Sequence, residues 1–198
     1  ARIVARGRQT EKDPEDAMPD EIFTLSDLEL ASRLSFFLWS SVPDDELIQL
    51  ASRNRLSDPD ILEDQVTRML ADERSRALVD NFAGQWLHLR NLDSVNPDGL
   101  VYPNFDENLR QAFLLETSQF FNSIMAEDRP VTELLTANYT FVNERLARHY
   151  GIEGIKGDDF QRVEHTDPNR FGILGHGSIH TVTSFPHRTS PVVRGKWV

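Results

Sequence analysis

The sequence predicts a mainly α protein: a helical bundle of about six to eight helices, followed by an irregular region rich in Gly and Pro with little or no β structure. Three observations support this prediction. Residues 105–126 carry the longest uninterrupted helical pattern, with apolar residues on one face: Leu109, Phe113, Phe120 and Ile124. Capping signals precede several earlier apolar segments. After Gly151 the helical periodicity stops.

We expect three segments along the chain. Residues 1–23 are polar and charged, which predicts an extended arm or a linker. Residues 24–152 form the helical module. Residues 153–198 form an irregular module that is cut off at the start of a helix, because Ser190-Pro191 is a helix-start signal close to the end. We therefore expect the sequence to be a piece of a longer polypeptide.

Helix-start signals divide the helical module. Ser26 and Glu29 match a capping box, in which each side chain bonds the backbone N–H of the other residue. Pro43 is the predicted first residue of a second helix, and Pro59 that of a third, because proline fits the first helical turn. Asp106 is the predicted cap of the long helix.

The remaining helices follow from apolar stripes and stop signals. A bend near residues 72–74 separates the third helix from a fourth over residues 76–89, whose predicted core stripe is Leu78, Val79, Phe82, Trp86 and Leu89. Residues 139–142 are β-branched and aromatic but too short to require a strand, and residues 160–164 alternate weakly. Asn143 is placed to cap a further helix that Gly151 ends.

Composition excludes several classes of function. The net charge is −11 and the pI is about 4.9, which disfavours nucleic acid as a partner because phosphate binding needs clustered Lys and Arg. The chain has no cysteine, so it holds no disulfide, thiolate ligand or covalent haem attachment of its own. We expect no cofactor within this chain. No apolar run approaches the roughly 20 residues of a membrane span, and no signal peptide is visible.

One histidine pair has the spacing of metal ligands. His176 and His180 are four residues apart, which places both rings on one side of a helix. His187 and Asp167 are near in sequence and would complete a ligand set. The glycines beside His176 argue against a firm helix, and no Glu follows His176 in the metalloprotease pattern. Histidines with ordinary structural or surface roles are the preferred interpretation, and we expect no metal site.

Other motifs are incomplete. The oxygen-bearing residues between 96 and 106 do not match the spacing of a calcium loop, so turn and capping roles explain them better. Ser178 lacks the second glycine of a G-x-S-x-G elbow. The glycine-rich residues 151–157 lack the Lys-Ser/Thr ending of a phosphate loop.

A family resemblance runs through five segments in order: residues 25–51 (LSDLELASRLSFFLWSSVPDDELIQLA), 82–93, 105–121, 137–152 and 188–198 (RTSPVVRGKWV). Together they resemble the multi-domain proteins of planctomycetes and related bacteria that carry cytochrome-c-type segments. The central modules of those proteins are catalogued as domains of unknown function. The resemblance covers nearly everything from Thr24 onward.

The resemblance implies an exported, periplasmic or extracellular protein with C-x-x-C-H haem sites in its other modules. Its partners would be other domains of the same polypeptide or cytochromes, and an oligomer is left open. If haem lies against this region, the resemblance offers His149, His176, His180 or His187 as axial or neighbouring contacts. The family supplies no established catalytic residue.

Arg188, Arg194 and Lys196 cluster positive charge in an otherwise acidic chain. One interpretation is salt bridging to the acidic helical body. The other is a surface for a haem propionate or another carboxylate, because the Arg fork matches carboxylate geometry. The candidate cofactor-binding residues are therefore His176, His180, His187 and Arg188.

Three hypotheses about function follow. The first is a non-catalytic structural module that positions haem domains or a partner for electron transfer. The second is a metal- or haem-dependent oxidoreductase, or a hydrolase, with its site within residues 165–188. The third is an extracellular binding protein, which would need exposed Trp and Tyr along a groove.

Overall fold

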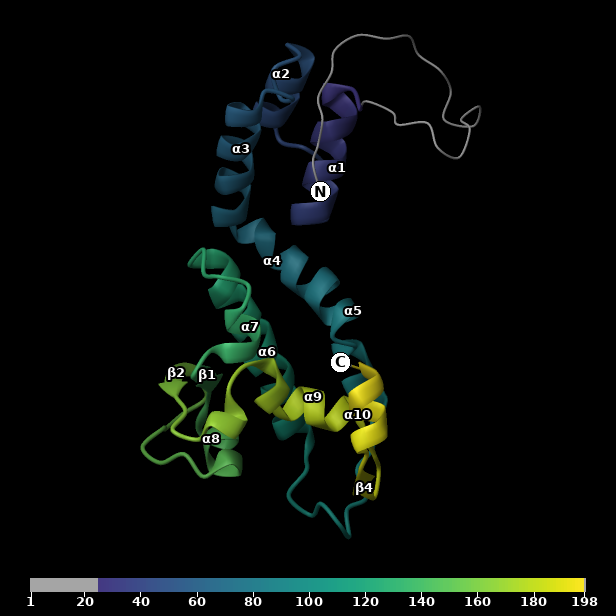
Figure 1. Cartoon of the computed structure of the whole chain (residues 1–198), viewed down its shortest axis with the longest axis vertical. Coiled ribbons are helices and arrows are strands. Elements are labelled where there is room, and N and C mark those ends of the chain that lie inside the picture. The colour runs from purple at the N-terminus through teal and green to yellow at the C-terminus, as the bar shows by residue number, and fades with distance from the viewer. Residues whose placement is uncertain (1–24, 198) are drawn as a thin grey trace, which may run out of the picture. The chain divides into compact units, whose positions relative to one another are not determined.

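The computed structural model describes residues 25–197 (Figure 1). The predicted arm over residues 1–23 lies outside the described residues. The described chain is mainly α, as predicted, with two small two-stranded antiparallel sheets. It divides into two compact units, between Ser75 and Arg76. The predicted boundary between residues 152 and 153 stays a prediction.

The first unit consists of three helices and a short turn. In order these are α1 (Asp27–Trp39), α2 (Asp45–Ser52), α3 (Pro59–Ala71) and the 3-10 turn η2 (Glu73–Ser75). Helix α1 contacts both α2 and α3, so the three helices share one small core (Figure 1). The buried apolar residues of this core are Ala31, Leu38, Trp39, Leu47, Ala51, Leu56 and Met69.

Two of the three predicted helix starts in this unit are confirmed. The capping box at α1 is complete: Glu29 N–H donates to Ser26 Oγ (3.3 Å), and Ser26 N–H donates to Glu29 Oε2 (2.8 Å). Pro59 is the first residue of α3. The predicted start of α2 at Pro43 is wrong: Asp44 caps the helix by accepting the Leu47 N–H at 3.1 Å, so α2 begins at Asp45, two residues after Pro43.

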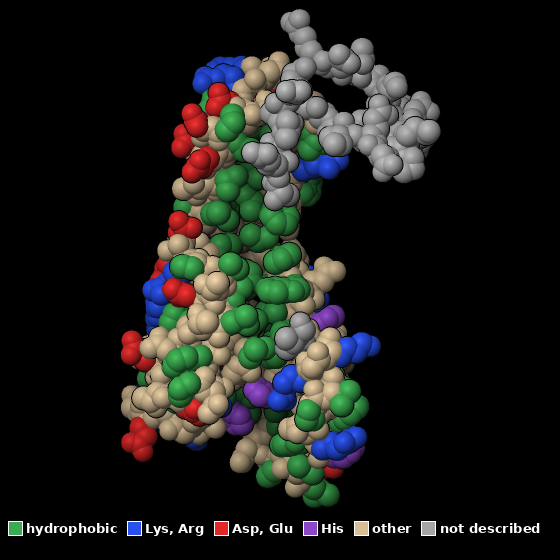
Figure 2. Space-filling model, viewed as in Figure 1, with side chains coloured by type: hydrophobic (Ala, Val, Ile, Leu, Met, Phe, Trp, Pro, Cys, Tyr) green, Lys and Arg blue, Asp and Glu red, His purple; other side chains and the backbone are tan. Residues whose placement is uncertain are grey.

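Several large apolar side chains of the first unit are exposed. Phe37 of α1 is 60% exposed, while its neighbour Leu38 is buried. Leu28, Phe36, Val42 and Ile48 are exposed as well. Hydrophobic side chains accordingly reach the surface over α1, α2 and the turn between them (Figure 2).

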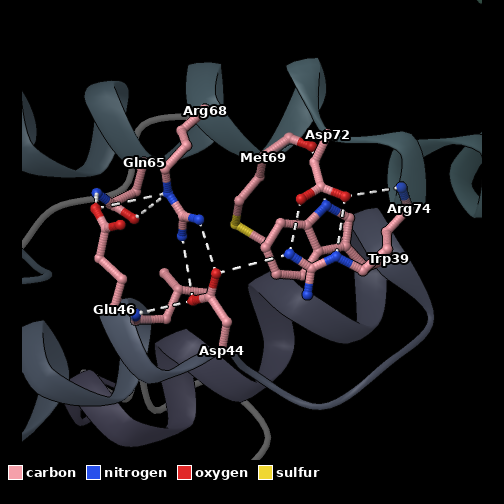
Figure 3. A network of polar contacts seen from close by, with 9 residues as sticks. Trp39, Asp44, Glu46, Gln65, Arg68, Met69, Asp72 and Arg74 are labelled. Atoms are coloured by element: carbon pink, nitrogen blue, oxygen red, sulfur yellow. Dashed lines mark hydrogen bonds and ion pairs between the residues drawn. The ribbon is translucent and has the colours of Figure 1, made fainter.

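A network around Trp39 connects the helices of the first unit (Figure 3). The buried Trp39 donates its indole N–H to the Met69 carbonyl at 2.9 Å. The Arg74 guanidinium lies 3.5 Å from the Trp39 ring centroid, a cation–π contact. Asp44, which caps α2, also accepts from Arg68 of α3 at 2.7 Å. The Asp44 carboxylate therefore both caps α2 and links it to α3.

The second unit contains the other elements. They are α4 (Arg76–Leu78), the π turn η3 (Val79–Ala83), α5 (Gly84–Trp86), η4 (Leu89–Ser94), α6 (Glu107–Ala126), α7 (Glu133–Thr136), β1 (Tyr139–Val142), α8 (Glu144–Tyr150), β2 (Gln161–Glu164), η5 (Pro168–Arg170), η6 (Ile173–Gly175), α9 (Gly177–Val182), β3 (Ser184–Phe185), β4 (Arg188–Thr189) and α10 (Pro191–Trp197).

Helix α6 is the centre of this unit, as the sequence predicts. Asp106 caps it by accepting the Leu109 N–H at 2.7 Å. The predicted apolar face is buried: Leu109, Phe113, Phe120 and Ile124. Helix α6 contacts η3, η4, α7, β1, α8 and α9, so segments far apart in the sequence pack against one rod (Figure 1).

The predicted fourth helix is interrupted, and part of its stripe is wrong. Residues 76–86 form α4, a π turn and α5 rather than one regular helix. Val79 and Leu89 are buried as predicted, but Phe82 is 47% exposed and Trp86 is 51% exposed. The extra residue in a π turn rotates the following side chains, which disrupts a stripe predicted from regular 3.6-residue spacing. The two exposed rings stack on each other, with centroids 5.9 Å apart.

The two segments with weak strand signals pair with each other. Strand β1 is antiparallel to β2, with Tyr139 opposite Glu164 and Val142 opposite Gln161. Asn143 caps α8 and Gly151 ends it at φ +72°, both as predicted. The pairing supplies the partner that each short strand needs.

A short helix, α9, forms where the glycines beside His176 argued against a firm helix. Helix α9 begins at Gly177, directly after His176. A Cβ on Gly177 would overlap the Phe113 ring of α6. Glycine at this position therefore permits close approach of α9 to the central helix.

Candidate functional site

The second unit encloses a pocket of about 430 Å³. Its walls come from the 95–105 connection, α6, the end of α8, the η5–α9 segment and the β3–β4 hairpin. The apolar lining includes Val95, Val101, Tyr102, Phe105, Leu109, Phe113 and Phe185. Most of the accessible wall is therefore apolar, as in pockets that bind small molecules.

Specific bonds hold the 95–105 connection over the pocket. The buried Arg110 of α6 donates to the carbonyls of Leu92 and Val95. Asp98 N–H donates to the Pro186 carbonyl at 2.8 Å, which ties the connection to the β3–β4 hairpin. Arg145 of α8 donates to the Asn104 carbonyl at 2.6 Å. The wall is thus anchored to three other elements.

The polar groups that line the pocket are basic or neutral. Arg170, His149 and His180 lie in the wall, whereas no Asp or Glu lines the pocket among the described residues. The Arg170 guanidinium carbon lies 3.9 Å from the centroid of the Tyr150 ring. Its Nη2 is buried and has no hydrogen-bond partner within residues 25–197.

A buried acidic group lies behind Tyr150. Glu116 of α6 is 0% exposed and accepts hydrogen bonds from Tyr150 Oη (2.7 Å) and Thr140 Oγ1 (2.8 Å). Burial, which penalises the carboxylate form, raises the pKa of Glu116 to about 7 despite these donors. The group is therefore balanced between its two protonation states near neutral pH.

Tyr150 connects the buried carboxyl to the pocket. Its ring lines the pocket and its hydroxyl, besides donating to Glu116, accepts the Gly177 N–H at 2.8 Å. Burial and the neighbouring carboxylate raise the pKa of Tyr150 well above its ordinary value, so the hydroxyl stays protonated.

A second cluster of buried polar side chains is centred on Thr117. Its Oγ1 lies 3.0 Å from His176 Nδ1 and 2.6 Å from Ser178 Oγ. Burial is the main cause that lowers the pKa of His176 to about 3, so the ring is neutral at physiological pH. Its Nε2 finds no partner among the described residues, and its ring packs edge-on against Phe120 at 4.9 Å. The arrangement resembles a nucleophile and base in composition, but all three side chains are buried.

The structure separates the predicted site residues. His176 is 1% exposed and belongs to the interior, whereas His180 lies in the pocket wall and is open to solvent. His187 is exposed in the two-residue turn between β3 and β4. Arg188 is exposed on β4, with its guanidinium carbon 5.1 Å from the Phe185 ring centroid. No group of three or more His, Cys, Asp or Glu residues with metal-site geometry occurs within residues 25–197.

The predicted basic cluster does not form salt bridges to the helical body. Neither Arg188, Arg194 nor Lys196 has an ion pair with a described residue. Arg194 instead donates its Nε–H to Thr183 Oγ1 at 3.3 Å. The tryptophans do not line the pocket: Trp39 is buried in the first unit and Trp86 packs against Phe82.

The main site residues were missed at the level of sequence. Glu116 had one usable signal, because it lies on the apolar face of α6 between Phe113 and Phe120, where a charged residue is unusual. Tyr150 and Arg170 reach the pocket through tertiary packing, for which the sequence holds no local signal.

Fold and site together define a class: a helical module whose second unit carries an apolar pocket beside a buried carboxyl group. A family model described as PSD4, protein of unknown function (DUF1592), matches residues 25–152. The match covers more than half of the chain, and the protein belongs to this family. No curated protein and no solved structure matches the chain significantly. Within the described residues, every helix is too short or too polar to cross a membrane.

Proposed function

We propose that the chain is a non-catalytic structural module of an exported, multi-domain protein of the cytochrome-c type. In this role it positions haem-carrying segments, or a cytochrome partner, for electron transfer. The family match supports the module, and the resemblance of residues 25–51 and 188–198 to planctomycete cytochrome-c-associated proteins motivates the rest of the proposal.

One observation carries the proposal. Four polar side chains of kinds used in catalysis are inside the protein and hydrogen-bonded there: Glu116 to Thr140 and Tyr150, and Thr117 to His176 and Ser178; each of the four is 1% exposed or less. Buried polar groups that satisfy one another specify a packed interior. A substrate in the pocket would meet mainly apolar walls, together with Tyr150, Arg170, His149 and His180.

The surface of the first unit is compatible with contacts to other domains. Leu28, Phe36, Phe37, Val42 and Ile48 are exposed there (Figure 2). Exposed apolar groups of this kind mark surfaces that pack against a partner. Further domains of the same polypeptide are the partners that the proposal names.

The test uses the full-length gene product that contains this chain, purified from its natural host. The proposal predicts an export signal, at least one C-x-x-C-H sequence outside these residues, and the absorption spectrum of c-type haem. A full-length product without any haem would contradict it.

Two histidine variants separate the proposal from the oxidoreductase alternative. His180→Ala removes a histidine of the pocket wall, and His88→Asn is the matched control, because His88 is exposed, lies outside residues 165–188 and has a positive φ that asparagine tolerates. The structural module predicts an unchanged haem spectrum and unchanged haem reduction by ascorbate for both variants. A changed spectrum in His180→Ala alone would favour a haem- or metal-dependent site within residues 165–188.

A further inference from the structure

The lining of the pocket has a charge opposite to that of the chain. The sequence carries a net charge of −11, yet Arg170 is the charged residue in the lining, and no carboxylate lines the pocket among the described residues. The chain has 32 acidic residues, and none of those described lies in the pocket lining. The Arg170 charge in the wall favours an anion over a cation; the buried Glu116 behind Tyr150 interacts with that charge but does not line the pocket.

Arg170 has free hydrogen-bonding capacity at this position. The face of its guanidinium covers the Tyr150 ring at 3.9 Å, and its buried Nη2 has no hydrogen-bond partner in the described chain. No described Asp or Glu forms an ion pair with it. A buried donor without a partner is costly, so a ligand that supplies an acceptor would relieve that cost.

The other walls indicate what the ligand carries besides an acceptor. Tyr102, Phe105, Phe113 and Phe185 provide aromatic surface around a volume of about 430 Å³. This volume lies in the range of pockets for small organic molecules. Aromatic walls bind apolar bodies, whereas inorganic anions gain nothing from them.

We infer that this pocket binds a small organic carboxylate with an apolar body, with the carboxylate on Arg170 and the body against the aromatic walls. A guanidinium matches a carboxylate through two parallel N–H···O bonds. This inference does not rest on the proposed structural role, because it concerns residues of the second unit alone.

The binding experiment uses the complete chain and calorimetric titration with two acids. 3-Phenylpropanoate tests an aromatic body and octanoate tests an aliphatic one; 3-phenylpropanamide and octanamide are their uncharged matches. The expected result is saturable binding of one acid per chain, at least about tenfold tighter than its amide, because charge-assisted hydrogen bonds are the stronger kind. An amide that binds as tightly as its acid, or no saturable binding of either acid at millimolar concentration, would overturn the inference.

Arginine variants locate the binding. Arg170→Gln removes the charge in the pocket and should weaken binding of the acid by about tenfold or more, while leaving binding of the amide nearly unchanged. Arg148→Gln is the matched control, because Arg148 is exposed on α8, pairs with Glu144 and does not line the pocket. Equal losses in both variants, or full affinity in Arg170→Gln, would refute the assignment. If Arg170→Gln does not fold, as judged by circular dichroism, the acid–amide comparison in the unchanged chain decides.

Discussion

Glu116 is the residue on which the interior of the second unit depends most. It is a carboxyl group on the apolar face of α6, without access to water, and its two oxygens each accept from one neighbouring hydroxyl. The charged form is costly in such a place, while the neutral form keeps the same volume. Its ionisation is therefore linked to folding.

The first prediction concerns the pH dependence of Glu116→Gln. The folded pKa is about 7 against 4.5 in an exposed chain, so the contribution of Glu116 is fully present below pH 4.5 and is lost as the pH rises to 7. This loss amounts to about 3 kcal/mol. Glutamine does not ionise, so between pH 4.5 and 7.5 the variant should gain about that much relative to the wild type.

Urea unfolding of both proteins across this pH range measures the difference. The matched control is Glu107→Gln, a largely exposed carboxylate on the same helix. A constant difference between Glu116→Gln and wild type over the whole range would refute the burial account.

His176 has the opposite pH dependence. Its folded pKa is about 3 against 6.5 in an exposed chain, so its contribution is present above pH 6.5 and is lost as the pH falls toward 3. His176 thus opposes Glu116 between about pH 4.5 and 6.5, because one group loses stability on acidification while the other gains it.

At the scale of elements, the approach of α9 to α6 depends on a residue without a side chain. Gly177 contacts the Phe113 ring, and its N–H bonds Tyr150. This contact positions α9, which carries His180 into the pocket wall. The absence of a side chain at Gly177 therefore determines both the packing of α9 on α6 and the shape of the pocket wall.

The second prediction is that Gly177→Ala destabilises the protein by about 1–3 kcal/mol, because the added methyl group overpacks the interface. Gly84→Ala is the control: that glycine is also buried and helical, but a Cβ there would meet no atom within 4 Å. It should be neutral or stabilising by up to about 1 kcal/mol. Thermal unfolding compares the two, and equal effects would show that the Phe113 contact is unimportant.

The third prediction concerns the first unit. Asp44→Ala removes both the cap of α2 and the 2.7 Å ion pair to Arg68 (Figure 3). The expected loss is about 1–2 kcal/mol, most of it from the cap, because a partly exposed ion pair contributes little. Asp45→Ala, one residue further on and exposed, should cost less than about 0.5 kcal/mol. Denaturant unfolding followed by tryptophan fluorescence, to which Trp39 in this unit contributes, measures both variants.

At the scale of the whole molecule, the features that could be predicted from the sequence are those determined by residues close together in the chain. The caps at Ser26, Asp106 and Asn143, and the stop at Gly151, follow from short-range hydrogen bonds and appear in the structure. The mainly α class follows from the same signals.

What depends on distant residues was not predictable. The β1–β2 pairing needs two segments about 20 residues apart, each too short to be stable alone. The exposed Trp86 follows from a π turn that regular periodicity does not anticipate. The pocket unites five segments, so Arg170 and Tyr150 meet only in the folded chain.

The fourth prediction is a property of the whole protein. Glu116 and His176 oppose each other between about pH 4.5 and 6.5, but burial also lowers the pKa values of His149, His165 and His180, so the free energy of unfolding should decrease moderately as the pH falls through this range. Below about pH 4.5 it should fall, because His176 then acts unopposed and paired carboxylates such as Asp44 and Asp72, whose pKa values are lowered by Arg partners and backbone N–H groups, become protonated. Urea unfolding at half-unit pH steps gives the curve, and a free energy of unfolding that rises as the pH falls from 6.5 to 4.5 would contradict it.

The central claim is that the buried polar groups are structural; the function proposed above adds that haem chemistry belongs to other segments. The most direct test is the rate of haem reduction by ascorbate in the full-length gene product carrying Glu116→Gln, with thermal unfolding measured on the same sample. The claim predicts a shifted unfolding temperature and a reduction rate within about twofold of the wild type. A reduction rate lowered by about tenfold or more, with unfolding unchanged, would contradict it.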